Sequence, residues 1–178
     1  YDMLNINFTE TTGQSLFSAK GKEIVRNAEL KGLATGEPSG AVYVNSNKGR
    51  KYILKTDKVA GYITQDLGAA VERYKKYKFE KMIYVTDFRQ REHFQQLFGI
   101  LKLFEYDWTN KLVHLPFGTV NFGKEIMATR KGNKILLQDV LDKIIKKAQE
   151  NIKKRKTKGD AKKVGIGAVK YIILKNEP

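Results

Sequence analysis

The sequence predicts an α/β protein in which parallel strands alternate with helices, after an N-terminal helix and β-hairpin. From residue 63 onward, segments with helical spacing of apolar residues alternate with short, continuous apolar runs. Before that point, one helical pattern precedes two strand-like segments that flank a tight turn. We therefore expect three parts: 1–60 with the helix and hairpin, 61–135 with the parallel strands, and 136–178 as a helical, lysine-rich segment.

The N-terminal part begins with a predicted helix over 18–33, whose apolar side chains recur at helical spacing and which stops near glycines. The segments AVYVN (41–45) and KYILKT (51–56) flank SNKGR. Because Asn-Lys-Gly is typical of a hairpin turn, we expect these two segments to pair as antiparallel strands.

The middle part alternates helices and strands. Residues 63–77 predict an amphipathic helix, and helices are also expected over 89–104 and 136–155. The runs KMIYVTD (81–87) and LVHLPFGTV (112–120) are almost wholly apolar, as expected of parallel strands buried on both faces. This alternation predicts a parallel sheet.

Composition excludes several classes of protein. A chain of 178 residues with 41% hydrophobic residues can bury its own core, and no stretch reaches the roughly 20 apolar residues of a membrane span. The first residues lack the pattern of a secretory signal, and the absence of cysteine excludes disulfides and thiolate metal sites. With two histidines in all, we expect no metal site made of protein side chains, and a cytoplasmic location.

The net charge of +15 indicates affinity for polyanions, above all nucleic acid. The same excess of lysine can also arise from an AT-rich genome, so charge by itself predicts only a possible nucleic-acid partner.

Two segments follow predicted strands, at the edge where α/β sheets bind ligands. One is Thr86 to Gln90, and the other is the basic loop in EIMATRKGNKILLQDVL (125–141). Lys-Gly-Asn is ordinary chemistry for a surface turn. Lysine, arginine and glycine together also suit a loop that holds phosphate groups, and the location after a strand favours this second interpretation.

Five motifs then occur in a characteristic order: GYITQDLGAA (61–70), QREHFQQLFGILK (90–102), HLPFGTV (114–120), IMATRKGNKILL (126–137) and VGIGAVKY (164–171). Their order and spacing resemble those of the arginyl-tRNA synthetases, class I enzymes with a Rossmann-like catalytic domain. The resemblance covers essentially the whole chain. It implies half of such a domain, with parallel strands.

The resemblance implies that Tyr62, Asp66 and Gln90 contact the substrate arginine. Tyr62 and Asp66 are four residues apart, so one helical turn presents both to the same side. A carboxylate can bind a guanidinium through two parallel hydrogen bonds, which an ammonium cannot reproduce. The alternatives are an acid favoured at a helix start for Asp66 and a half-buried packing side chain for Tyr62.

For ATP, the resemblance implies that His93, His114, Phe117 and Gly118 line the nucleotide side, Gly118 permitting close approach of the backbone. Both histidines can instead be packing residues that satisfy a backbone group.

The basic loop resembles the KMSKS loop of class I enzymes, which stabilises the charge that develops on the ATP phosphates. The matching residues are Met127, Thr129, Arg130 and Lys131, with Gly132 at the nucleotide. Two positions depart from the family pattern: Ile126 stands for a lysine and Ala128 for a serine. Lys124 is a possible substitute for the lysine. Mg²⁺ is expected to accompany ATP.

A HIGH-type motif is absent, because His93 and His114 are too far apart in the sequence to form one. We therefore expect the second half of a synthetase catalytic domain, inactive in isolation. Its partners would be arginine, ATP, tRNA(Arg) and the remainder of the parent chain, and it would have no membrane partner. The parent would activate arginine with ATP and transfer it to tRNA(Arg).

Two alternatives remain open. One is a non-catalytic synthetase-like protein that binds tRNA or regulates translation, which the departures at Ile126 and Ala128 favour. The other is a plain basic nucleic-acid-binding α/β module. The lysine-rich stretch 146–163 is either a solvated helix end or a contact with the tRNA backbone, and it contains no aromatic residue for base stacking.

Overall fold

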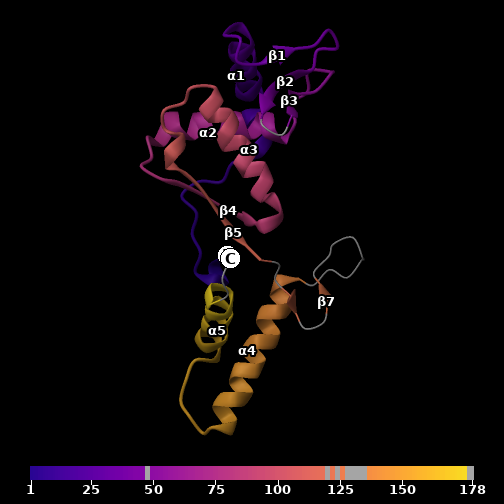
Figure 1. Ribbon diagram of the computed structural model, residues 1–178. Coiled ribbons are helices and arrows are strands. Elements are labelled where there is room, and N and C mark those ends of the chain that lie inside the picture. The colour runs from indigo at the N-terminus through magenta and orange to yellow at the C-terminus, as the bar shows by residue number, and fades with distance from the viewer. Residues whose placement is uncertain (47–48, 119–120, 123–124, 127–135, 176–178) are drawn as a thin grey trace. The chain divides into compact units, whose positions relative to one another are not determined.

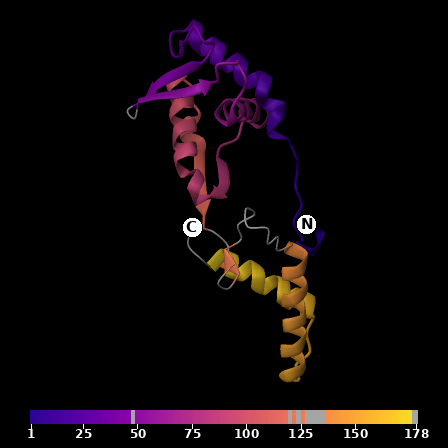
Figure 2. The same ribbon diagram turned by 90° about the vertical axis from the view of Figure 1, so that its right-hand side faces the viewer.

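The computed structural model describes residues 1–46, 49–118, 121–122, 125–126 and 136–175. They form two compact units: the first is Phe8–Pro116, and the second combines Tyr1–Asn7 with Phe117–Pro178. Figures 1 and 2 show the elements of each unit. The mixed α/β class with a parallel pair of strands and an antiparallel hairpin is confirmed.

The first unit begins with the short 3₁₀ helix η2 (Gln14–Phe17), which leads directly into α1 (Ser18–Leu30). In α1 the buried residues recur every three or four positions, which places them on one stripe that faces the core: Gly21, Ile24, Val25 and Ala28. The chain leaves the helix through Gly32, whose φ of 72° is easy for glycine. The predicted N-terminal helix is confirmed.

The predicted hairpin is also confirmed. Strand β2 (Val42–Ser46) pairs antiparallel with β3 (Gly49–Leu54), and β2 pairs on its other side with the two-residue strand β1 (Thr35–Gly36). The hairpin is fixed to the helices by the fully buried Thr64, whose hydroxyl donates a hydrogen bond to the carbonyl of Ile53 on β3.

Helix α2 (Tyr62–Tyr77) lies between α1 and α3 (Figures 1 and 2). Its contact with α1 is made by backbone. A methyl group added to Gly68 would lie 2.7 Å from the amide nitrogen of Gly21 and in contact with the Phe17 carbonyl, and one added to Gly21 would meet the Thr64 carbonyl. The two glycines therefore allow the helices to approach more closely than any side chain would permit.

The parallel pair consists of β4 (Met82–Asp87) and β5 (Leu112–Phe117), connected through η3 (Phe88–Gln90), α3 (Arg91–Leu103) and η4 (Thr109–Lys111). Tyr84 packs on α3, its ring centroid 4.7 Å from that of Phe94.

The prediction that these strands are buried on both faces is wrong for this chain. Ile83 and Val85 are 52% and 60% exposed, and burial alternates along both strands. The physical reason is that α3 covers one face, while the apolar side chains of the other face are left in solvent.

The core of the first unit joins the helices and both sheets. Tyr74 of α2 stacks on Trp108 with ring centroids 4.7 Å apart, and Phe79 meets both rings edge-on. Such aromatic pairs add roughly 1 kcal/mol each beyond the area they bury. The largest fully buried side chains are Ile53, Leu67, Leu97, Leu101, Val25, Val44 and Thr64.

The second unit is dominated by α4 (Leu137–Lys154) and α5 (Ala161–Lys175), which pack on one another. It also holds η1 (Asp2–Leu4) and the short antiparallel strands β6 (Asn121–Phe122) and β7 (Glu125–Ile126). At the helix crossing, a methyl group on Gly165 would lie 3.2 Å from the Cα of Ile145. Among the helices described here, none combines the length and apolar character that a bilayer crossing requires.

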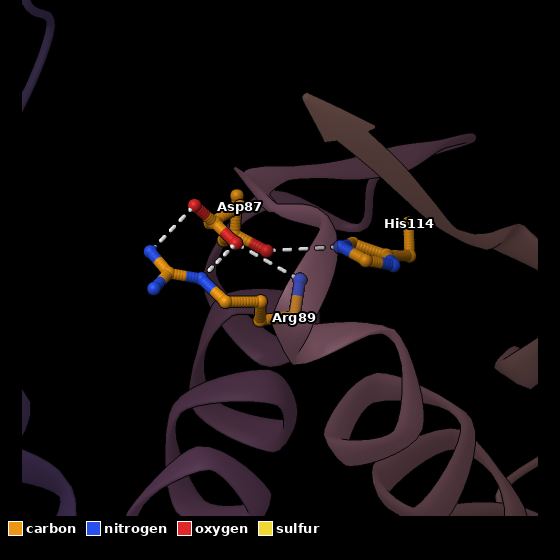
Figure 3. Close-up of polar contacts among 4 residues, drawn as sticks. Asp87, Arg89 and His114 are labelled. Carbon is orange, nitrogen blue, oxygen red and sulfur yellow. Dashed lines mark hydrogen bonds and ion pairs between the residues drawn. The ribbon is translucent and has the colours of Figure 1, made fainter. Parts of the chain in front are cut away.

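On β5, His114 ties the two parallel strands to α3. Its Nε2 lies 2.9 Å from the Thr86 hydroxyl on β4, a contact drawn as a dashed line in Figure 3. The His114 ring stacks on Phe94 of α3 with centroids 4.6 Å apart. Burial, followed by the charge of Arg91, lowers the pKa of His114 from its ordinary 6.5. The folded protein therefore keeps this imidazole neutral at a pH where the unfolded chain begins to protonate it.

The α1–α2 contact predicts opposite effects for two glycine-to-alanine changes. Gly68→Ala should lower the free energy of unfolding by about 2 kcal/mol or more, because the new methyl group meets backbone that cannot move aside cheaply. Gly99→Ala on α3 has open space around the new methyl group and should raise stability by about 0.5–1 kcal/mol. Urea unfolding followed by circular dichroism measures both. Equal effects of the two changes would contradict the contact.

The His114 environment predicts a pH-dependent stability. The contribution of neutral His114 is complete above about pH 6.5 and is lost as the pH falls through the lower pKa of the folded state. The free energy of unfolding should therefore decrease as the pH falls below about 6.5. In His114→Gln this part of the decrease should disappear. Parallel curves for the two proteins would show that His114 is not the group responsible.

Candidate functional site

The carboxylate of Asp66 lies where three elements of the first unit meet. Its Oδ2 is 2.7 Å from Nε2 of His93 on α3, and its Oδ1 accepts a hydrogen bond of 3.0 Å from Nε2 of Gln14 on η2. Both Asp66 and His93 are half-buried. Of the predicted site residues, the structure therefore brings Asp66 and His93 into direct contact.

Two donors on separate oxygens fix the plane of this carboxylate. A carboxylate offers about four lone-pair positions on its two oxygens, so each Asp66 oxygen keeps room for a second donor. That arrangement suits a planar group with two parallel N–H bonds, such as a guanidinium.

Tyr84 of β4 lies close enough to Asp66 for the two groups to interact electrostatically. Tyr84 is largely buried, and its hydroxyl has no hydrogen-bond partner among the described residues. Burial raises the pKa of Tyr84 to about 12; the nearby Asp66 charge adds to this and the Arg73 charge opposes it. The phenol therefore stays uncharged at physiological pH.

Tyr62 and Gln90 flank this carboxylate in the chain. Tyr62 is the first residue of α2, one turn before Asp66, and its side chain is 75% exposed, so it is not the half-buried packing residue considered above. Gln90 ends η3, three residues before His93, and is also exposed. No hydrogen bond joins either side chain to Asp66 among the described residues. Their convergence on a common ligand stays a prediction.

Gln14 is the member of this cluster that the sequence did not indicate. It lies in the segment TTGQSLF, in which no residue was predicted to belong to the site, and it is 52 positions away from Asp66. Gln14 reaches the carboxylate because η2 leads directly into α1, and α1 packs against α2.

The carboxyl end of β4 carries a second polar group, drawn in Figure 3. The Asp87 carboxylate accepts hydrogen bonds from Arg89 at its backbone nitrogen (2.9 Å), Nε (2.8 Å) and Nη2 (2.9 Å). These bonds lower the pKa of Asp87 and raise that of Arg89. The Arg89 fork is therefore occupied within its own turn, and the turn leads directly to Gln90.

The residues predicted for the nucleotide side lie along and after β5. His114 faces α3 and Thr86, whereas Phe117 and Gly118 are exposed. Among the described residues, nothing lies within 4 Å of where a methyl group on Gly118 would be, so none of them blocks close approach to its backbone. His114 thus has the packing role that was considered for it, and a nucleotide contact stays a prediction.

The predicted loop residues Met127, Thr129, Arg130, Lys131 and Gly132 lie outside the described residues, as do Ala128 and Lys124. Among the residues that the structure does describe, no group of three His, Asp or Glu side chains could hold a metal ion.

Comparison with known proteins adds independent information. The family model for the catalytic domain of class I (R) tRNA synthetases matches residues 1–177. An arginine–tRNA ligase of Clostridium perfringens is 38% identical over 184 residues, covering 99% of this chain and 32% of the relative. One of Ligilactobacillus salivarius is 39% identical over 185 residues, with 99% and 33% covered. The chain thus spans about one third of the length of the curated relatives it matches.

Solved structures show the same fold. Arginyl-tRNA synthetase of Plasmodium falciparum superposes with a TM-score of 0.78 at 22% identity, covering 99% of this chain and 31% of that one. The enzyme of Thermus thermophilus gives a TM-score of 0.78 at 17% identity, covering 99% and 37%. With a family model matched over nearly its whole length and this fold, the chain belongs to the family of class I arginyl-tRNA synthetases, within their catalytic domain.

Proposed function

We propose that this chain forms the arginine-binding part of an arginine–tRNA ligase, which activates arginine with ATP and transfers it to tRNA(Arg) in the cytoplasm. The observation that carries the proposal is the Asp66 carboxylate, held by Gln14 and His93 with lone pairs left on both oxygens. Family membership indicates the reaction class, and the geometry supports Asp66 as the group that would select arginine.

In this proposal Asp66 accepts two parallel hydrogen bonds from the guanidinium, and Tyr62 and Gln90 complete the arginine contacts. Gln14 and His93 already hold the Asp66 carboxylate in place. Arginine binding therefore costs little additional side-chain conformational entropy. Lysine, with a single ammonium group, cannot make the same paired bonds and is selected against.

For ATP, the open backbone at Gly118 suits close approach of a flat base, and His114 and Phe117 would line the same side. His93 would then link the two substrates, since it contacts Asp66 on one side and lies next to Phe94, on which His114 stacks.

The loop residues Met127, Thr129, Arg130, Lys131 and Gly132 would stabilise the negative charge that builds up as the arginine carboxylate attacks the α-phosphate. Mg²⁺ bound with ATP would neutralise part of the phosphate charge.

The exposed apolar face of β4 and β5 supports a role within a larger domain. Ile83, Val85 and Leu115 present aliphatic side chains to solvent on strands of a type that is usually covered on both faces. We infer that the rest of a parent protein covers this face and supplies the first half of the ATP site. The isolated chain should then lack ATP–pyrophosphate exchange. The division into 1–60, 61–135 and 136–178 stays part of the proposal.

A second candidate is a non-catalytic synthetase-like protein that binds tRNA. The observation that favours it is the replacement of the usual lysine and serine of the loop by Ile126 and Ala128. Under this alternative the parent protein binds tRNA and arginine but does not catalyse ATP–pyrophosphate exchange.

The test of the proposed function is Asp66→Asn in the parent enzyme. The change removes the charge that the guanidinium pairs with, at a cost of about 1.5–3 kcal/mol per charged hydrogen bond. We expect the KM for arginine in ATP–pyrophosphate exchange to rise by about 10- to 100-fold or more, with the KM for ATP almost unchanged.

Asp87→Asn is the matched control, because that carboxylate is engaged by Arg89 within its own turn. It should leave the KM for arginine near the wild-type value. If Asp66→Asn and Asp87→Asn change this constant equally, Asp66 is not the group that binds the guanidinium.

A further inference from the structure

The segment that leads into η2 is attached to α2 at a point away from the candidate site. The Glu10 carboxylate accepts hydrogen bonds from Nζ of Lys76 on both of its oxygens, each 2.7 Å long, and a third from the hydroxyl of Tyr77. Both donors lie in the last turn of α2. The chain is therefore anchored to this helix four residues before it reaches Gln14.

The other end of the same segment meets the candidate site, because Gln14 donates its hydrogen bond of 3.0 Å to Asp66. We call residues 10–14 the N-terminal strap. Asp66 and Lys76 are ten residues apart on α2, which corresponds to about 15 Å along the helix axis. Four residues of extended chain reach at most about 13–14 Å. The strap is therefore about as long as the stretch of helix between its two anchors.

Packing does not hold the N-terminal strap against the helix. Residues 8–16 are all exposed, and the strap itself contains no apolar side chain. A cavity of about 450 Å³ lies between this segment and α2, with Thr9 and Thr12 on one side and Glu72 and Arg73 on the other. The position of the strap therefore depends on the polar contacts at its two ends.

The anchor at Glu10 has more contacts than a simple surface ion pair. An exposed pair usually contributes little, because water screens it and two long side chains must be ordered. Here three hydrogen bonds converge on one carboxylate, and the Lys76 bond, followed by the Tyr77 bond, lowers the pKa of Glu10. The bond to Glu10 likewise raises the pKa of Lys76. Both groups therefore stay charged at neutral pH, where charged hydrogen bonds are strongest.

Gln14 lies at the junction between the strap and the packed helices. It is the first residue of η2, whereas the close contact with α2 is made by the carbonyl of Phe17 at the other end of this short helix. The crossing of the helices thus fixes the end of η2, and the strap fixes its start. A change at Glu10 should be transmitted to the Gln14 side chain through the chain between them.

We propose that the N-terminal strap holds the Asp66 carboxylate in its arginine-binding orientation, with Glu10 as a positioning residue that acts through Gln14. The effect on arginine rests on the proposed function. When Glu10 is released, Gln14 exchanges its bond to Asp66 for bonds to water. Arginine binding then has to order the carboxylate as well as the substrate. Glu10 itself touches no substrate.

The first test follows Gln14 directly in the 178-residue chain, without substrates. The probe is the ¹⁵N NMR signal of its side-chain amide, identified by its absence in Gln14→Ala. In Glu10→Gln this signal should move to the position of a free glutamine side chain. The matched control is Glu23→Gln, which breaks a surface ion pair with Lys20 of the same 2.7 Å length within α1. The control should leave the Gln14 signal in place.

A second variant removes the same anchor from the helix side. Lys76→Met should move the Gln14 signal as Glu10→Gln does. The double variant should show no further change, because both substitutions delete one contact and their effects are not additive. Since the pair is exposed, the melting temperature of each variant should stay near that of the wild type.

The third measurement is made on the parent enzyme. Glu10→Gln should raise the KM for arginine in ATP–pyrophosphate exchange by about 3- to 10-fold, the range expected when one more side chain has to be ordered on binding. The kcat and the KM for ATP should stay near their wild-type values. A general loss of structure would instead change all three constants.

A Gln14 signal that does not move in Glu10→Gln, or that moves equally in Glu23→Gln, would overturn the strap. If the signal moves and Asp66→Asn raises the KM for arginine while Glu10→Gln does not, the positioning role is wrong and the proposed function stands. If Asp66→Asn also leaves this KM unchanged, the proposed function is wrong. The Gln14 signal then still decides whether the strap holds the carboxylate.

Discussion

The crossing of α1 and α2 at Gly21 and Gly68 is the constraint on which the first unit depends. At this point the two helices touch through backbone, and the carbonyl of Phe17 at the end of η2 abuts α2. The crossing therefore fixes η2 against α2, and with it the side chain of Gln14 against Asp66. Thr64, on the same helix, attaches the hairpin through the Ile53 carbonyl. This close contact between α1 and α2 thus positions both the candidate site and the β-hairpin.

From Asp66 a continuous set of contacts leads to the strands. His93 meets Asp66, its neighbour Phe94 stacks on His114, and His114 reaches Thr86 at the carboxyl end of β4. The first two of these contacts are made by α3, so this helix connects the side where arginine is proposed to bind with the strand ends where α/β proteins bind nucleotides. A movement of α3 would therefore displace residues on both of these sides at once.

Sequence patterns predicted the helices and the hairpin well, because hydrophobic spacing and turn chemistry are local properties. They could not predict how many faces of β4 and β5 are covered. Ile83 and Val85 are apolar whether or not a second layer lies on them, and the chain by itself covers one face. Gln14 escaped prediction for a similar reason: its contact depends on how two helices cross, and no local pattern encodes that. The roles of Tyr62, Gln90 and the loop around Arg130 rest on motif resemblance and are not tested by the structure.

Lys162 and Lys163 lie in the first turn of α5, at the positive end of the helix dipole. Their charges weaken the start of this helix, while Asp160 stabilises it by accepting hydrogen bonds from both backbone nitrogens. Any polyanion that neutralises them also stabilises the folded unit, because what binds only the native state shifts the folding equilibrium toward it. A bound polyanion would therefore make the start of α5 more stable than it is in the free protein.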